Sequence, residues 1–360
     1  METAGGCGYG RAMRPHVALI GCGGISRLHL TALEQARATV RWTCDLVPEL
    51  AKAAAARCGA QAGGDWRPAI ADPAVGLVIV GTCSNAHRDV CLAAIAAGKA
   101  VLSEKTLAND AATSWEITSA AQAAGVRLRT NYMKRYLPAV VKARELLPEL
   151  GELISTHART WQPWGDLWLR HPAEGSQHTP PGGVSGQTQR YGGAALPCAG
   201  SHILDLVHHL VGRPSRVFAD EHVPAGRDYD MRTSALMRVS GRGSVLFEAC
   251  AHPLNHIGFN RDGWDEVVEI SGVYGRLTIH TPMWDQGDRI GSLLIHEDAR
   301  TRAATEHRFA PVSPFNAAVA AALDGAPDHE LDAGYAVDEL IAALQRSARS
   351  GNAVDVPWRN

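Results

Sequence analysis

The sequence predicts an α/β protein that begins with a doubly wound, parallel sheet. Its 360 residues are more than one small domain needs and suit two domains with substantial cores. A hydrophobic fraction of 46% with 20% charged residues is ordinary for a folded, globular chain. In the first third, short apolar runs alternate with helical patterns, which is typical of βαβ units.

The first apolar run, "HVALI" at residues 16–20, ends at a glycine-rich turn before a helical pattern. Gly21, Gly23 and Ser26 give the spacing G-x-G-x-x-S, a near match to the dinucleotide-binding fingerprint. The first glycine allows a tight turn, the second lets the backbone approach a pyrophosphate, and the small third residue lets helix and strand pack closely. We therefore expect this turn, with Gly24 and Ile25, to contact a dinucleotide if the following elements complete the fold.

The second apolar run, "TVRWTCD", ends in Asp45. A carboxylate at the end of this strand accepts hydrogen bonds from the adenosine ribose and repels a 2′-phosphate. The next residues, "LVPEL", include no arginine that would attract such a phosphate. The pattern favours NAD over NADP, although Asp45 could also simply end the strand or open the turn before Pro48.

The alternation continues to about residue 131. Strands are expected in "GLVIVGT", "AVLSEK" and "VRLRTNY", with helices in "NAHRDVCLAAIAAG" and "DAATSWEITSAAQAAG". Ligands of such sheets bind outside the carboxyl ends of the strands. The candidate cofactor contacts at or just beyond these ends are Thr82, Ser84, Asn85, His87, Glu104 and Lys105.

From about residue 15 onward the chain resembles the glucose-fructose oxidoreductase, inositol dehydrogenase and MocA (Gfo/Idh/MocA) family. The motifs "GCGGIS", "AGKAVLSEKTLA", "GGAALPCAGSHILDLVHHLVG" and "GWDEVVEISGVYGRL" occur in the family's order. The resemblance implies an NAD-binding Rossmann domain followed by an α/β domain with a large open, mostly antiparallel sheet. It also implies oxidation of a ring hydroxyl of a sugar, cyclitol or amino-sugar compound, or reduction of the ketone. Homodimers or homotetramers formed through that sheet are implied as well.

We accordingly expect a flexible tail at residues 1–14, the Rossmann domain at 15–131 and a substrate-binding domain at 132–312. The C-terminal helices, at 313–360, should pack back on the Rossmann domain. A net charge of −2 leaves no basic stripe for nucleic acid, and no apolar run is long enough to cross a membrane. The eight cysteines include no CxxC pair, which favours reduced thiols and a cytoplasmic protein without a zinc knuckle.

The family's E-K-P motif reads Glu104, Lys105, Thr106 in this chain. The resemblance places Lys105 near the nicotinamide and the reacting hydroxyl. Thr106 replaces a proline whose peptide bond is often cis in the family. Because a cis bond before another residue costs roughly 3 kcal/mol, a trans bond and a slightly re-aimed lysine are expected here.

The family's second motif, D-x-G-x-H-x-x-D, reads with Cys198 in place of its first aspartate, followed by His202 and Asp205. At helical spacing, these residues and His209 would share a polar face turned to a cleft or to water. Two residues at ligand spacing are too few for zinc, so no metal site is expected. Cys198 is expected to be a neutral replacement of the carboxylate. Our hypothesis is that His202 is the main acid/base and Lys105 polarises the oxygen, with the reverse assignment left open.

Polar and aromatic residues elsewhere are candidates for contacting an unphosphorylated ring. The substrate candidates are Lys105, Arg135, Tyr136, Arg159, Trp161, Trp164, Arg190, Tyr191, His202 and His256, with Gln187 and Gln189 as further hydroxyl readers. The tryptophans at 161, 164 and 168 are equally compatible with an ordinary core. Two other functions stay open: glycoside cleavage with internal redox cycling of NAD, and a non-catalytic NAD-binding scaffold.

Overall fold

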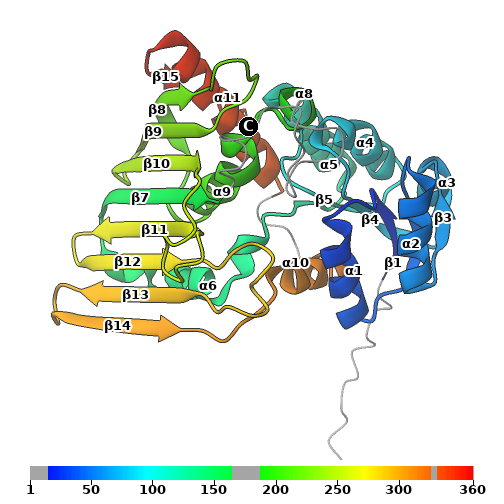
Figure 1. Cartoon of the computed structure of the whole chain (residues 1–360), viewed down its shortest axis with the longest axis horizontal. Helices are drawn as coiled ribbons and strands as arrows, with labels where there is room; N and C mark the ends of the chain where they lie inside the picture. The colour runs from blue at the N-terminus through cyan, green and yellow to red at the C-terminus, as the bar shows by residue number, and fades with distance from the viewer. Residues whose placement is uncertain (1–14, 164–186, 326–330, 360) are drawn as a thin grey trace, which may run out of the picture.

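The computed structural model describes residues 15–163, 187–325 and 331–359 (Figure 1). Its first sheet has six strands in the order β3-β2-β1-β4-β5-β6, and every neighbouring pair is parallel. The strands are β1 (His16–Ile20), β2 (Val40–Cys44), β3 (Gln61–Gly63), β4 (Val75–Val80), β5 (Ala100–Ser103) and β6 (Leu128–Thr130). This is the Rossmann strand order, with the switch between β1 and β4 where a dinucleotide binds.

Helices cover both faces of this sheet, which explains why its central strands are almost entirely apolar. They are α1 (Ser26–Gln35), α2 (Pro48–Cys58), α3 (Arg67–Ala71), α4 (His87–Ala96) and α5 (Ala111–Ala124). The carboxylate of Asp110 caps α5 by accepting from Thr113 N at 2.9 Å, and Gly125 ends it in the left-handed conformation.

The second sheet has nine strands in the order β14-β13-β12-β11-β7-β10-β9-β8-β15. Within this sheet, β7 and β10 are the only described neighbours that pair in parallel, and the other described neighbours are antiparallel. The strands are β7 (Leu153–Gln162), β8 (Pro214–His222), β9 (Arg232–Val239), β10 (Ser244–Ala251), β11 (Asp265–Gly272), β12 (Gly275–His280), β13 (Leu293–Asp298), β14 (Ala303–Arg308) and β15 (Val354–Asp355). The predicted fold class, a parallel Rossmann sheet plus a large, mostly antiparallel sheet, is confirmed.

Helices cover one face of the second sheet, and the described residues leave the other face uncovered. Figure 1 shows α6 (Pro138–Leu146), α9 (Ser201–Leu210) and α11 (Ala333–Ser350) between this sheet and the Rossmann domain. On the opposite, outer face, Ile154, Phe218, Leu236 and Leu246 are between 46% and 57% exposed. Alternate residues of the strands thus face a core and an uncovered surface.

The chain returns to the first domain near its C-terminus. The helix α10 (Pro314–Leu323) packs against α1, while α11 contacts α5 of the Rossmann domain as well as α9 and β8. The seven cysteines among the described residues are thiols and not disulfides. Within the described ranges, every helix is too short or too polar to cross a membrane.

Candidate active site

A cavity of about 270 Å³ lies where the carboxyl ends of β5 and β6 meet the second domain. Residues of both domains line it: Ile25, Glu104, Lys105, Asn131, Met133, Gln162, Cys198, His202, Trp264, Trp284 and Phe315. Lys105 follows β5, His202 lies on α9, and Gln162 ends β7. The fold therefore brings the two predicted acid/base residues into one wall.

The glycine turn beside this cavity fits a dinucleotide. Gly21 has φ +92°, and a Cβ there would lie 2.5 Å from the carbonyl carbon of Gly81, so the position requires glycine. Gly23 and Gly24 face open space, as a backbone that admits a pyrophosphate must. Ser26 begins α1 and donates from Oγ to Gly23 O at 2.6 Å. The turn and the helix N-terminus together form the expected cradle.

Asp45 lies directly after β2, beside this turn. Its Oδ2 accepts from Cys22 N at 2.7 Å, and its Oδ1 accepts from Val47 N at 2.8 Å. The carboxylate is therefore held against the glycine turn, where a ribose would lie. Leu46, the next residue, is 90% exposed and carries no charge that would attract a 2′-phosphate.

The predicted contacts after β4 divide into two groups. Thr82, Ser84 and Asn85 lie in the turn that includes the short helix η1 (Ser84–Ala86), and Ser84 Oγ accepts from Thr106 Oγ1 at 3.1 Å. His87, predicted to contact the cofactor, is fully buried, with Nε2 3.0 Å from Thr82 O and Nδ1 3.0 Å from Thr106 O. The ring thus braces two backbone segments, and a contact of His87 with the cofactor stays a prediction.

Glu104 is held by its neighbours and lines the cavity floor. Its Oε1 accepts from Asn131 Nδ2 at 2.7 Å and lies 2.7 Å from His29 Nε2. Burial raises the pKa of this carboxyl, but the hydrogen bonds and charge of His29, with Asn131 and Lys105, bring it below its ordinary value. A charged carboxylate therefore supports the backbone that presents Lys105.

The structure corrects one expectation about Lys105 and shows what holds its ammonium. The Lys105–Thr106 peptide bond is cis, so the expected trans bond is wrong. Lys105 Nζ donates to the backbone carbonyl of Cys198 at 2.7 Å, whereas Cys198 Sγ lies 4.0 Å from Gly193 O. The carbonyl oxygen of Cys198 thus accepts a hydrogen bond from the ammonium.

A buried carboxylate fixes that carbonyl. Cys198 belongs to a π-helical turn, Ala195–Gly200, that precedes α9. Asp230 accepts from Ala194 N at 2.8 Å and from Leu196 N at 2.6 Å at the start of this turn. These bonds satisfy backbone donors that the turn would otherwise leave buried and unpaired.

His202 is 7% exposed and lines the cavity from α9. Burial, then the charges of Lys105 and Lys134, hold its pKa well below the ordinary value, so the ring is neutral. The predicted polar face is wrong in one respect, since Asp205 is fully buried and its Oδ2 accepts from Arg135 Nε at 2.7 Å. A buried Arg–Asp pair thus anchors the helix that carries His202.

Most of the other predicted substrate contacts lie outside this cavity. Arg135 is paired with Asp205, Tyr136 Oη accepts from Arg129, Arg159 pairs with Asp265, Trp161 Nε1 donates to Glu248, and His256 is exposed in a loop. Arg159 also lines the outer face of the second sheet. None of these five residues is among the described residues that line the cavity, and their contact with a ligand stays a prediction.

The loop before Cys198 is described only from residue 187. Trp164 and Trp168 lie outside the described residues. Arg190 and Tyr191 end α8 (Gln187–Tyr191), the backbone carbonyl of Gln189 accepts from Asn109, and Tyr191 Oη lies 3.2 Å from Cys83 Sγ. Tyr191 lines a second cavity next to the first.

Several cavity residues escaped the sequence predictions. They are Asn131, Met133, Gln162, Trp264, Trp284 and Phe315. Trp264 lies over the ammonium of Lys134, 5.0 Å from ring centroid to Nζ, and Lys134 forms a fully buried ion pair with Glu266. The available signal in the sequence was a charged residue within an otherwise apolar or β-forming stretch. These residues are Lys134 in "NYMKRY" and Glu266 in "WDEVVEI".

Two family models match the chain. The model described as "Oxidoreductase family, NAD-binding Rossmann fold" matches residues 15–132, and the "GFO/IDH/MocA C-terminal domain" matches residues 140–278. Among curated proteins, levoglucosan dehydrogenase of Pseudarthrobacter phenanthrenivorans is 29% identical over 48% of this chain and 42% of its own. Inositol 2-dehydrogenase/D-chiro-inositol 3-dehydrogenase of Lactiplantibacillus plantarum is 32% identical over 37% of this chain and 39% of its own.

The chain thus spans about two fifths of the length of these curated relatives. A solved structure of levoglucosan dehydrogenase in complex with NADH and levoglucosan shares the fold, with a TM-score of 0.79 at 22% identity, over 96% of this chain and 100% of that one. The resemblance seen in the motifs is confirmed. The chain belongs to the Gfo/Idh/MocA oxidoreductase family, and its first domain is the family's NAD-binding Rossmann domain.

Proposed function

We propose that this protein is an NAD-dependent dehydrogenase that oxidises a secondary hydroxyl on the ring of a sugar, cyclitol or amino-sugar compound, or reduces the matching ketone. The observation that carries the proposal is that Lys105 and His202 line one cavity beside a dinucleotide cradle. An alcohol dehydrogenase needs a group to take the hydroxyl proton and a group to stabilise charge on the oxygen.

The two side chains suit different parts of this task. NAD, held by the glycine turn and Asp45, would supply the acceptor for the hydride. His202 is neutral and can accept the hydroxyl proton. Lys105, directed by the carbonyl of Cys198, can donate a hydrogen bond to the reacting oxygen.

The cavity lining supports a small ring with several hydroxyls. Trp264, Trp284 and Phe315 offer apolar faces, and Gln162 and Asn131 offer amide groups. The lining contains one cation, Lys105, and no arginine within the described ranges, which favours an unphosphorylated ring.

The test is to incubate the purified protein with NAD, and separately with NADP, and with free sugars, levoglucosan, inositols and aminocyclitols. Reduction of NAD with one class of ring, absent from a Lys105→Met variant that still binds NAD, would support the proposal. Release of an aglycone without net change in NAD would favour glycoside cleavage instead. Tight NAD binding without turnover of any compound would favour a scaffold.

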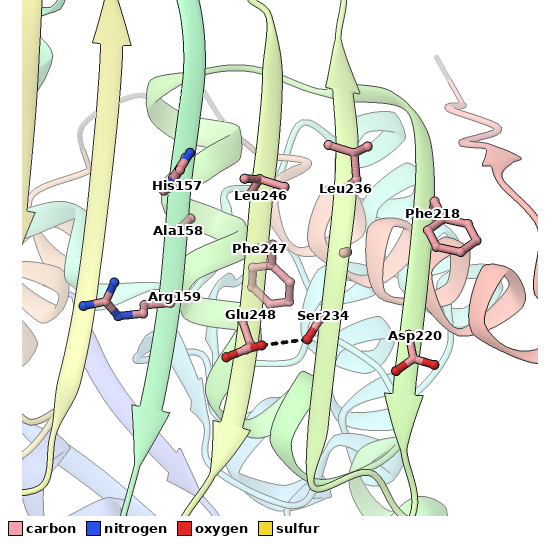
Figure 2. A pocket seen from close by; sticks show the side chains of 11 residues that line it. His157, Ala158, Arg159, Phe218, Asp220, Ser234, Leu236, Leu246, Phe247 and Glu248 are labelled. Carbon is pink, nitrogen blue, oxygen red and sulfur yellow. Dashed lines mark hydrogen bonds between the residues drawn. The ribbon is translucent and has the colours of Figure 1, made fainter. Parts of the chain in front are cut away.

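We further propose that two copies associate through the outer face of the second sheet. Figure 2 shows neighbouring rows there: Phe218, Leu236 and Leu246 form an apolar row, and Asp220, Ser234, Glu248 and Arg159 form a polar row. The polar row has an acid at one end and an arginine at the other. A two-fold axis that reverses the row would bring opposite charges together.

A further inference from the structure

A line of buried polar groups leads away from the cavity wall behind His202. Nδ1 of His202, Oη of Tyr132 and Oδ1 of Asp338 are each buried without a hydrogen-bond partner among the described residues. The hydroxyls of Ser201 and Thr130, on neighbouring elements, are also buried without a hydrogen-bond partner among the described residues. Buried polar groups are normally paired with protein or internal water, so such a cluster indicates a hydrated interior path.

The rings that carry the first two groups lie against each other. The rings of Tyr132 and His202 meet edge to face, with centroids 6.0 Å apart at 88°. Nδ1 of His202 is inaccessible, so the exposure of this ring towards the cavity comes from its other atoms. A proton accepted at Nε2 can therefore leave from Nδ1 into the interior.

The third group opens on a different cavity. Asp338 lies on α11 and lines a cavity of about 300 Å³ with Thr106, Ala108 and Gln345. Its Oδ2 accepts from Ala108 N at 2.9 Å. The segment 104–108 borders both cavities, because Glu104 and Lys105 line the active one and Thr106 and Ala108 line the other.

The helix α11 passes close to the end of β6 on this route. A Cβ on Gly334 would lie 2.3 Å from Thr130 Oγ1, so only glycine lets the helix approach the hydroxyl. Asp338 is one turn further along the same helix face. The hydroxyl of Thr130 and the carboxyl of Asp338 thus follow one another along the path.

Charges favour movement of a proton in this direction. Lys105 and Lys134 face His202 and disfavour its charged form. Burial, then Asp338, Asp205 and Glu104, raise the pKa of Tyr132 despite the opposing charge of Arg135. Burial, with the charge of Asp110, raises the pKa of Asp338 well above its ordinary value, against the hydrogen bond from Ala108 N. A proton is thus disfavoured on the imidazole and favoured on the carboxyl.

We propose that Tyr132 and Asp338 form a proton relay that carries the proton taken up by His202 to the cavity lined by Asp338. The relay rests on the proposed dehydrogenase function. For each alcohol oxidised, the carbinol carbon would give its hydride to bound NAD and the hydroxyl its proton to His202 Nε2. Asp338, protonated at rest, then releases its proton to water and, as a carboxylate, takes the phenolic proton of Tyr132, while Tyr132 takes the Nδ1 proton of His202, directly or through water. Tyr132 and Asp338 are then protonated as before, and transfer of the remaining imidazole proton from Nε2 to Nδ1 through water restores the starting tautomer of His202.

Two substitutions interrupt the relay and keep the packing. Tyr132→Phe keeps the ring beside His202, and Asp338→Asn keeps an acceptor for Ala108 N but cannot take up a proton. In weakly buffered solution, we expect NADH to form at the wild-type rate in the first turnover, with proton release, followed by an indicator dye, slowed about tenfold. Imidazole at high concentration should restore steady-state turnover in both variants.

The control is Thr118→Val, which removes another buried, unpartnered hydroxyl on α5, outside the path. It should release protons like the wild type. Unchanged proton release in both relay variants would overturn the proposal. A loss shared by Thr118→Val, or one that imidazole does not restore, would also overturn it by showing a packing effect.

A substrate-free measurement separates this proposal from the function on which it rests. The infrared band of a protonated carboxylic acid should be present near neutral pH and disappear in Asp338→Asn. Absence of the band in the wild type overturns the relay whatever the substrate. If the band is present and no ring alcohol is oxidised, it is the dehydrogenase proposal that fails.

Discussion

Lys105 Nζ and the backbone carbonyl oxygen of Cys198 lie 2.7 Å apart, which joins the end of β5 to the π-helical turn of the second domain. Because the contact uses the main chain, the side chain at position 198 is not what holds the lysine. It is the shape of the turn, fixed by Asp230, that places the acceptor.

Substitutions at Cys198 should therefore separate shape from charge. Cys198→Ala keeps the carbonyl and should lower kcat by no more than about threefold, since no strong hydrogen bond is lost. Cys198→Asp places a carboxylate near the ammonium and stabilises its charged form. The fall of activity at alkaline pH, where the ammonium loses its proton, should then move to higher pH, as measured by kcat between pH 6 and about 10. Superimposable pH profiles for the two variants would contradict this account.

The roles of His202 and Lys105 can be distinguished by their pH dependence. His202→Asn should lower kcat by about 10²–10⁴ with NAD affinity unchanged, because the proton acceptor is lost. Burial and the charges of Lys105 and Lys134 lower the pKa of His202, so the wild-type enzyme should keep its activity well below the ordinary histidine value of 6.5. Steady-state rates from pH 5 upward check this. If the fall of activity at acid pH disappears in Lys105→Met and remains in His202→Asn, the two roles are reversed.

The cofactor preference should depend on Asp45 and the residue after it. In Asp45→Asn with Leu46→Arg, the amide can still accept from Cys22 N while the arginine attracts a 2′-phosphate. We expect the ratio of kcat/KM for NADP to that for NAD to rise by about 100-fold, equivalent to roughly 2.7 kcal/mol. Leu50→Arg, one helical turn away on α2, is the matched control and should leave the ratio near the wild-type value.

The sequence predicted the parts of the site that follow strand ends or stand in spaced motifs. The glycine turn, Asp45, Lys105 and His202 are found together because parallel strands end at one edge of the sheet. The sequence did not show the ion pairs of Arg135 and Arg159, because their partners, Asp205 and Asp265, lie 70 and 106 positions away along the chain. Local patterns cannot show which exposed-looking arginine a distant carboxylate will bind.

The aromatic residues that line the cavity were not predicted from the sequence either. Trp264, Trp284 and Phe315 come from three separate segments and resemble ordinary core residues in the sequence. The cis bond at Lys105–Thr106 was missed for a different reason, because the expectation rested on the intrinsic preference of a residue other than proline. In both cases tertiary packing decided what local chemistry could not.

The outer face of the second sheet should control self-association. Leu236→Asp and Leu246→Asp each place a charge in the apolar row and should shift the protein towards the monomer, since a buried charge there would lack a partner. Light scattering coupled to size exclusion measures the mass of each variant. Val273→Asp, an exposed apolar residue in the turn between β11 and β12, is a control that should leave the mass unchanged. A monomeric wild-type protein at micromolar concentration would refute this interface.

The stability of the protein should fall as pH rises from about 4.5 to 7 because of Glu221, on β8. Burial, then the charge of Asp230, raises its pKa to about 7, with Asp220 adding to the shift and Arg349 and Thr233 opposing it. The folded state therefore binds more protons than the unfolded chain between about pH 4.5 and 7, so this stabilisation is present below that window and lost as pH rises through 7.

Glu221→Gln removes the titration and keeps the size of the side chain. The variant should resemble the wild type in free energy of unfolding at pH 5 and exceed it at pH 8, where the wild-type carboxylate is charged and half-buried. Urea unfolding followed by circular dichroism at both pH values measures the difference. Glu306→Gln, an exposed carboxylate on β14, provides the matched control and should show the same free energy as the wild type at each pH. A Glu221→Gln effect of equal size at pH 5 and pH 8 would assign the change to packing and not to the proton.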